Sequence, residues 1–296
     1  FMCNNLLVCF VRNDGAPQLS MAGMLAGSIF NVIMDYVLIF PLGLGMQGAA
    51  LATAASPLVS MLVLSIHFIK KKNKFHLRPV RPSLKSFADI CALGSSSLVV
   101  EVSSGLVMLV FNLLILRISG NTGVAAYGAV ANIAILLTSI FNGISQGIQP
   151  LTSQNSGKKD SAAIRQILRY ALALSLVLAV LSYALMYFAS TPVVALFNKE
   201  QNPQLRAIAE NGMRLYFMAL PFIGVNIVAA SFLSSIARPR QAFAISIGRG
   251  IVVVIPAAFL LAGMLGLNGI WLTMPVTELI VCLLAVAFLR RETKRT

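Results

Sequence analysis

Charged residues are scarce in this sequence of 296 residues. Asp, Glu, Lys and Arg together make up 11% of the chain, whereas hydrophobic residues make up 58%. Soluble domains carry about 25% charged and about 45–50% apolar residues. This shortage of charge argues against a soluble enzyme, a disordered chain and a disulfide-bonded scaffold. The composition predicts a polytopic membrane protein built from α-helices.

Residues that carry enzyme chemistry are also few. The two histidines, His67 and His76, flank a basic loop and are expected to be ordinary. The four cysteines lie in apolar segments without metal-ligand spacing: Cys3, Cys9, Cys91 and Cys282. The phosphate-loop motif and the HExxH motif are absent from the sequence. We therefore expect neither an enzyme nor a cofactor.

Long apolar runs dominate what the sequence does contain. A membrane-spanning helix needs about 20 apolar residues. Runs of this kind lie at about 1–11, 20–42, 46–69, 90–117, 123–148, 163–190, 207–235, 241–262 and 268–289. The first run is too short to span and resembles the end of a helix whose beginning is missing. The sequence thus predicts about eight full transmembrane helices and one partial helix.

The basic residues are distributed unevenly between the connections. Lys and Arg number 23 against 9 Asp and Glu, which gives a net charge of +14. Most of them lie in alternate connections, above all in the loop 70–89 and in the tail 290–296. Cytoplasmic connections attract Lys and Arg, so both segments are predicted to be cytoplasmic. Contact with the anionic surface of a lipid bilayer accounts for the charge, and we expect no nucleic-acid partner.

A weak internal repeat runs through the sequence. Gly45-Met46-Gln47-Gly48 returns as Gly266-Leu267-Asn268-Gly269, and Phe10 and Pro17 return 222 residues later. A parallel repeat of this kind is typical of transporters. It predicts two pseudo-symmetric helix-bundle lobes, the first of them incomplete by roughly three helices. The expected organisation is the remainder of a first six-helix lobe (1–69), a basic cytoplasmic linker (70–89), a second six-helix lobe (90–289) and a basic tail (290–296).

A carboxylate, an amide and a hydroxyl mark one candidate site. Asn31 and Asp35 are four residues apart on one helix face, and Thr53 lies on the next span. A charge at membrane depth costs about 2.5–3.5 kcal/mol, which makes it a candidate for function. Hard oxygen ligands suit a proton or Na⁺, so we predict cation coupling at Asn31, Asp35 and Thr53. The alternative is that these side chains only hold helices together.

Three further charged residues lie within predicted spans. Glu101 is mid-span among small residues and is predicted to take part in cation coupling, with a structural role as the alternative. Arg249 and Glu278 lie on the last two spans. We expect these two to neutralise each other as a structural pair across an antiparallel hairpin.

Several ordered motifs resemble one family of transporters. They are Arg12-Asn13-Asp14-Gly15, Asn31-x-x-x-Asp35, Gly45-x-x-Gly48 with the following Ala-rich turn to Thr53, and Gly143-x-x-Gln146-Gly147-x-Gln149-Pro150. In this order they resemble the multidrug and toxic compound extrusion (MATE) family over essentially the whole chain. The resemblance implies a twelve-helix transporter of two six-helix lobes, of which this chain supplies the end of the fourth helix through the twelfth.

The resemblance also implies a function. Members export cationic drugs or other organic compounds across the plasma (cell inner) membrane by antiport against H⁺ or Na⁺, with alternating access. Asn31, Asp35 and Thr53 match three residues of the first-lobe cation site, and Glu101 matches a seventh-helix glutamate. The alternatives are a lipid-linked oligosaccharide flippase of the same superfold and a non-transporting truncated remnant. Oligomeric state stays open.

Overall fold

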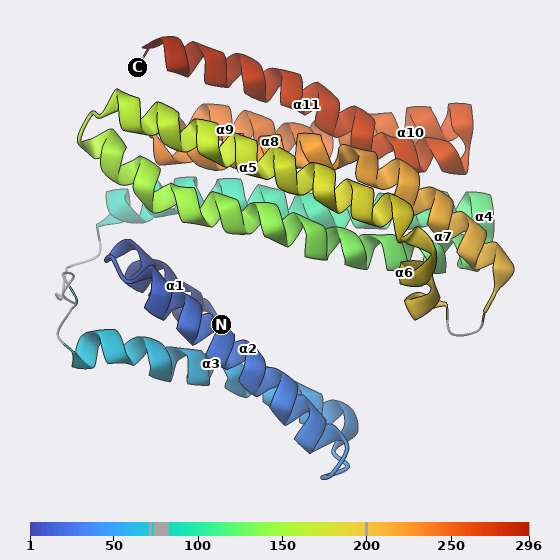
Figure 1. The fold of residues 1–296 in the computed structure, drawn as a ribbon, viewed down its shortest axis with the longest axis horizontal. Helices are drawn as coiled ribbons and strands as arrows, with labels where there is room; N and C mark the ends of the chain where they lie inside the picture. The colour runs from blue at the N-terminus through green and yellow to red at the C-terminus, as the bar shows by residue number, and fades with distance from the viewer. Residues whose placement is uncertain (71–72, 74–82, 199–200, 296) are drawn as a thin grey trace. The chain divides into compact units, whose positions relative to one another are not determined.

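The structure is a computed structural model that describes residues 1–70, 73, 83–198 and 201–295, and every regular element in these residues is helical (Figure 1). The elements are α1 (Met2–Asn13), α2 (Pro17–Ile39), α3 (Gly45–Ile69), α4 (Leu84–Gly157), α5 (Ser161–Phe188), α6 (Ser190–Phe197), α7 (Pro203–Tyr216), the short 3₁₀ helix η1 (Phe217–Ala219), α8 (Leu220–Ser235), α9 (Pro239–Ile247), the π-helical turn η2 (Gly248–Val252), α10 (Val254–Leu265) and α11 (Leu267–Arg295).

Seven helical segments of the described residues are long and apolar enough to cross a membrane. They are Pro17–Ile39, Gly45–Ile69, Glu101–Gly157, Ser161–Phe188, Pro203–Ser235, Pro239–Leu265 and Leu267–Glu292. The chain is therefore a multi-pass, all-helical membrane protein.

The difference between these seven segments and the eight predicted full spans lies in α4. Its apolar part has 57 residues, which would extend about 86 Å at about 1.5 Å per residue, far beyond a hydrocarbon core of about 30 Å. The rings of Phe111 and Tyr127 nevertheless lie 5.7 Å apart, although sixteen residues of straight helix would separate them by about 24 Å. Figure 1 shows the chain reversing within α4. The runs predicted at 90–117 and 123–148 are thus two antiparallel arms of one element.

Glycine makes this reversal and two others possible. Gly120 has φ 63° and ψ −159°, a conformation that is essentially restricted to glycine. Gly45 and Gly266 also have positive φ, 52° and 58°, at the start of α3 and before α11. Each of the three is the first glycine of a G-x-x-G sequence. The sequence analysis identified the G-x-x-G sequences at Gly45 and Gly266; at Gly120 it predicted the break between two spans without singling out the glycines.

The second glycine of each G-x-x-G sequence allows close packing of the two helices. A Cβ on Gly48 would lie 2.9 Å from the Leu38 backbone, and one on Gly269 would overlap the carbonyl of Leu261. A Cβ on Gly123 would meet side chains of the preceding arm, the nearest at 2.6 Å. Interhelical contact at these turns thus depends on the absence of a side chain.

A different corner recurs between consecutive hairpins. After α1, the N–H of Ala16 donates to the carbonyl of Val11 at 3.2 Å. After α8, the N–H of Arg238 donates to the carbonyl of Leu233 at 2.8 Å, 222 residues later. In both corners the preceding residue has positive φ, 87° and 59°, and a proline follows as the first helical residue. These are helix ends of the Schellman type.

The helices form two compact units, residues Phe1–Arg81 (unit 1) and Pro82–Thr296 (unit 2). Most of the predicted linker, residues 71–72 and 74–82, lies outside the described residues. Unit 1 has a small core of Val8, Val11 and Leu64.

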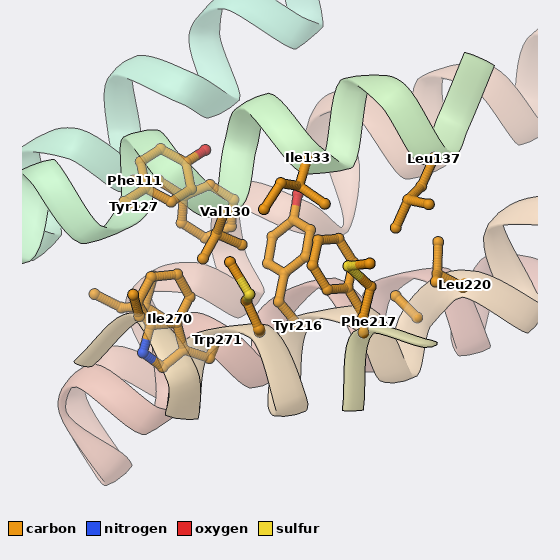
Figure 2. Close-up of a cluster of buried hydrophobic side chains, with 14 of the residues drawn as sticks. Phe111, Tyr127, Val130, Ile133, Leu137, Tyr216, Phe217, Leu220, Ile270 and Trp271 are labelled. Carbon is orange, nitrogen blue, oxygen red and sulfur yellow. The ribbon is translucent and has the colours of Figure 1, made fainter. Parts of the chain in front are cut away.

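Unit 2 has a much larger core, centred on aromatic residues of four helical segments (Figure 2). Trp271 of α11 is fully buried, and its ring lies 6.1 Å from that of Tyr127 on α4. Gly212 of α7 leaves space for this indole, because a Cβ there would lie 2.9 Å from the ring. Tyr216 and Phe217 extend the same cluster along the α7–η1 junction.

Candidate functional site

Three of the predicted cation-coupling residues, Asn31, Asp35 and Thr53, lie on the α2–α3 hairpin of unit 1. A Cβ on Gly27 of α2 would lie 3.0 Å from the Ser56 carbonyl of α3, whereas Gly48 packs against Leu38 at the turn. Asn31 and Asp35 lie between these contacts on α2. Thr53 lies between them on α3. Antiparallel packing therefore places Thr53 alongside the stretch of α2 that carries Asn31 and Asp35.

Two polar atoms of this site have no hydrogen-bond partner. Among the described residues, Asn31 Nδ2 and Asp35 Oδ1 are buried and unsatisfied. Buried polar groups in proteins are almost always hydrogen-bonded, so an exception calls for an explanation. Thr53 is exposed. The described residues contain no group of three or more His, Cys, Asp or Glu that could hold a metal ion.

Glu101 occupies a different environment. It is exposed on the first arm of α4 and does not line the cavity of unit 2. The predicted small-residue stretch around it does approach another helix, because a Cβ on Gly250 would lie 2.7 Å from Ser103 Cβ. The side chains of Ser95, Ser96 and Ser97, like that of Cys91, lie outside the described part of the structure, as does His76.

Unit 2 contains a cavity of about 470 Å³. Its wall combines aromatic and methionine side chains with a few polar groups. Its lining includes Met108, Tyr127, Tyr216, Phe217, Met274, Arg249 and Glu278. A cavity of this size and character is suited to a small organic molecule.

One ion pair lies in the wall of this cavity. Both Nε and Nη2 of Arg249 donate to Oε1 of Glu278, at 3.1 and 2.9 Å. Asn226 Nδ2 donates to Glu278 Oε2 at 2.7 Å and to the Glu278 carbonyl at 2.9 Å. The Glu278 side chain is 1% exposed and that of Arg249 is 22% exposed. Glu278 is thus held by donors from α8 and η2, while Arg249 keeps one side toward the cavity.

The π-helical turn η2 carries Arg249. Such turns occur as single-turn insertions in α-helices, frequently at functional sites. Gly250, in the same turn, packs against Ser103 of α4. Close contact at Gly250 therefore fixes the backbone that carries the guanidinium.

The sequence analysis missed Asn226, the cavity aromatics and η2. Asn226 is fully buried in α8, and an amide in the middle of an apolar span was a readable signal. Tyr127 and Tyr216 gave no signal, because aromatic residues are as common in an ordinary core as in a cavity wall. The π-turn depends on packing between helices far apart in the chain.

Comparisons with known proteins agree with this fold. A family model described as MatE matches residues 97–260, more than half of the chain. The multidrug export protein MepA of Staphylococcus saprophyticus is 28% identical over 291 residues, which cover 97% of this chain and 63% of that protein. MepA of Staphylococcus aureus is 26% identical over 294 residues, with the same two coverages. The chain thus spans about 63% of the length of these curated relatives.

Solved structures give the same result at the level of fold. A MATE structure in the bent conformation superimposes with a TM-score of 0.86 at 21% identity, over 99% of this chain and 65% of that one. An outward-facing multidrug resistance MATE family transporter of the MOP superfamily gives a TM-score of 0.90 at 21% identity, over 99% and 66%. Together with the family match, these findings identify the chain as a member of the MATE family, a family of transporters and not of enzymes.

Proposed function

We propose that this chain belongs to a secondary active transporter that exports cationic drugs or other organic compounds by antiport against H⁺ or Na⁺. The observation that carries the proposal is a pair of buried polar atoms, Asn31 Nδ2 and Asp35 Oδ1, that have no hydrogen-bond partner in the described part of the chain. A carboxylate oxygen without a donor in an apolar helix pair is ready to take a proton or a hard cation. The multidrug export proteins of Staphylococcus support the substrate class.

In the proposed mechanism, Asp35 is ionised in the inward-facing, drug-loaded state and takes up H⁺ or Na⁺ in the outward-open state. The ion drives transport only because its affinity differs between the two states. Asn31 and Thr53, on the same hairpin, supply the neighbouring oxygens. Cation uptake would bend α2 and shrink the drug site. Glu101 is a second proposed coupling carboxylate, acting in unit 2.

The proposed architecture is two pseudo-symmetric lobes related by a parallel repeat, in the plasma (cell inner) membrane with a cytoplasmic C-terminus. The two Schellman corners support it, since their hydrogen bonds recur at a constant offset of 222 residues. The G-x-x-G turns at Gly45 and Gly266 support it at an offset of 221. The basic tail at 290–296 supports the orientation.

Export of a fluorescent organic cation from energised vesicles or cells tests the function. In the full-length protein, Asp35→Asn removes the ionisable group and keeps a side chain of similar size. We expect gradient-driven export of ethidium to fall to the background of cells without the transporter.

Asp160→Asn is the matched control. Asp160 accepts a hydrogen bond from the N–H of Ala163 at the start of α5, and Asn is an equally good residue at such a position. We expect this variant to export normally. Wild-type export by Asp35→Asn would exclude Asp35 as the coupling residue.

A further inference from the structure

The guanidinium of Arg249 has N–H donors that its ion pair with Glu278 does not use. A guanidinium carries five N–H donors, and the structure assigns two of them to a single oxygen, Glu278 Oε1. The remaining donors of Arg249 have no partner among the described residues, and the side chain lines the cavity at 22% exposure. Planar guanidinium groups bind carboxylates and related anions through paired donors.

The charges of the cavity wall determine which protonation state of Glu278 allows an anion to bind. Arg249 and Glu278 are the charged residues of its described wall, and as an ion pair they balance. An anion added to this pair would leave one uncompensated negative charge in an apolar span, which is costly. One proton on the Glu278 carboxylate removes that charge and leaves Arg249 as the counter-ion of the ligand.

Glu278 has a partner in either protonation state. Asn226 Nδ2 holds the ionised carboxylate. Asn226 Oδ1 is buried and lacks a partner among the described residues. A rotation of this amide presents its oxygen as the acceptor for a protonated Glu278. The arrangement therefore offers the added proton a hydrogen bond that is unused in the structure.

The other groups near Glu278 do not replace Arg249. Tyr216 of α7 and Cys282, one turn along α11, lie within range of the Glu278 charge. The segments of α4, α8 and α9 that line the cavity contribute no charged side chain to its described wall. Arg249 is thus the cationic group that faces Glu278, and a ligand anion that displaces it must come with a proton.

The rest of the wall selects the body of the ligand. Tyr127, Tyr216 and Phe217 present aromatic surface, and Met108 and Met274 present thioethers. Aromatic rings stack on such surfaces, and thioethers adapt to varied shapes. We propose that the cavity of unit 2 binds an aromatic compound that bears a carboxylate, with the carboxylate on Arg249 and one proton taken up by Glu278. This chemistry differs from that of the organic cations above and does not involve Asp35.

The chain contains its own reporter for binding. Trp271 is the single tryptophan of the 296 residues, and it packs against Tyr127 of the cavity wall. Nitroaromatic compounds quench indole fluorescence at short range. Three matched probes are para-nitrobenzoate, para-nitrobenzylammonium and para-nitrobenzamide, which share one ring and differ in charge. Titration of the full chain in lipid nanodiscs with each probe gives three affinities.

We expect the carboxylate to bind most tightly, and its affinity to rise as the pH falls through the neutral range. Linkage to one proton limits this rise to about tenfold per pH unit. Arg249→Gln should weaken binding of the carboxylate by roughly 10- to 100-fold, the scale of a charge-assisted hydrogen bond. Glu278→Gln, which imitates the protonated acid, should bind the carboxylate tightly at every pH in this range.

Arg214→Gln is the matched control, because Arg214 lies over the Tyr187 ring at 5.3 Å and does not line the cavity. It should bind as the unmodified chain does. Tighter binding of the ammonium probe, or carboxylate binding that ignores pH in the unmodified chain, would overturn the proposal. A measured helical content equal to that of the unmodified chain establishes that each variant is folded. Loss of drug export in Asp35→Asn leaves these outcomes unaffected, so the two proposals fail separately.

Discussion

The mid-span carboxylates of the two units, Asp35 and Glu278, differ in their hydrogen bonding. In unit 1, Asn31 Nδ2 and Asp35 Oδ1 are buried without partners among the described residues. In unit 2, Glu278 receives hydrogen bonds from both Asn226 and Arg249. A carboxylate that accepts hydrogen bonds at both oxygens is held in one conformation, whereas an unsatisfied carboxylate oxygen is available to an ion or to another segment. Asp35 is thus the better candidate for coupling of the two carboxylates.

The corners of the units show a second contrast, in the sign of charge. In unit 1 the acid Asp14 lies in the corner, 2.8 Å from Nε2 of His67 on α3. In unit 2 the base Arg238 lies in the corner, 2.9 Å from Glu292 on α11. In both units a side chain of the corner thus pairs with a side chain of a later long helix, but the acid lies in the corner in unit 1 and on the helix in unit 2. The backbone geometry of the corner is shared, and the side-chain chemistry is not.

The largest expected effect concerns the tight turns that both units share. Gly269→Ala should destabilise the chain by about 3 kcal/mol or more, because the new Cβ overlaps a backbone carbonyl that cannot move aside. Gly48→Ala in unit 1 should be nearly as severe. Gly123→Ala should cost less, since its nearest contacts are side chains. Thermal unfolding in detergent, followed by circular dichroism, measures the order.

Gly263→Ala provides the control for these variants. Gly263 lies within α10 with nothing within 4 Å of its added Cβ. Alanine there should be neutral or stabilising by about 0.5–1 kcal/mol. Equal stability of Gly269→Ala and Gly263→Ala would show that the hairpin is looser than the structure has it.

The second-largest expected effect on stability concerns the Arg249–Glu278 ion pair of unit 2. Glu278→Leu leaves Arg249 without its counter-ion, which should cost about 3 kcal/mol. Combined with Arg249→Met, the loss should shrink, because the double variant has no uncompensated charge. A double-mutant cycle on unfolding free energies measures this coupling. Additive losses would mean that the ion pair contributes no more than its separate side chains.

The sequence predicted most of the helices and the charged residues compared here, Asp35 in unit 1 and Arg249 with Glu278 in unit 2. Apolar runs and turn glycines are local signals, so the hairpins at Gly45 and Gly266 were readable. The break at Gly120 was predicted from the two separate apolar runs, but its G-x-x-G sequence was not singled out because it lies outside the 221-residue repeat. Asp35 stood out because a carboxylate in an apolar run is rare.

The wall of the cavity in unit 2 could not be predicted from local sequence signals. It brings together α4, α7, α8, η2 and α11, and these contacts depend on tertiary packing. The π-turn at Gly248–Val252 has no local sequence signal that separates it from an ordinary helix. Asn226 could have been singled out, yet its partner Glu278 lies 52 residues away.

A smaller effect tests the reversed corners. Asp14→Ala removes the partner of His67, whose side chain is 3% exposed, and should cost about 1–3 kcal/mol. Arg238→Ala should cost about 0.2–1 kcal/mol, because Arg238 is 46% exposed and Glu292 keeps a hydrogen bond from Gln241. Denaturant unfolding compares the two. A larger loss for Arg238→Ala would indicate that burial does not set the strength of these links.

The smallest expected change in stability belongs to Asp35→Asn. Because Oδ1 of Asp35 makes no hydrogen bond among the described residues, the substitution breaks no bond at that atom and removes a charge from an apolar span. We expect unfolding free energy within about 1 kcal/mol of the unmodified chain, with a shift toward greater stability if anything changes. The same measurement on Glu278→Gln should show a clear loss, since that carboxylate is paired. A large destabilisation by Asp35→Asn would instead assign Asp35 a structural role and remove the distinction between the two units. If Asp35→Asn leaves the unfolding free energy unchanged and abolishes export, the Asp35 carboxylate is required for coupling and not for folding.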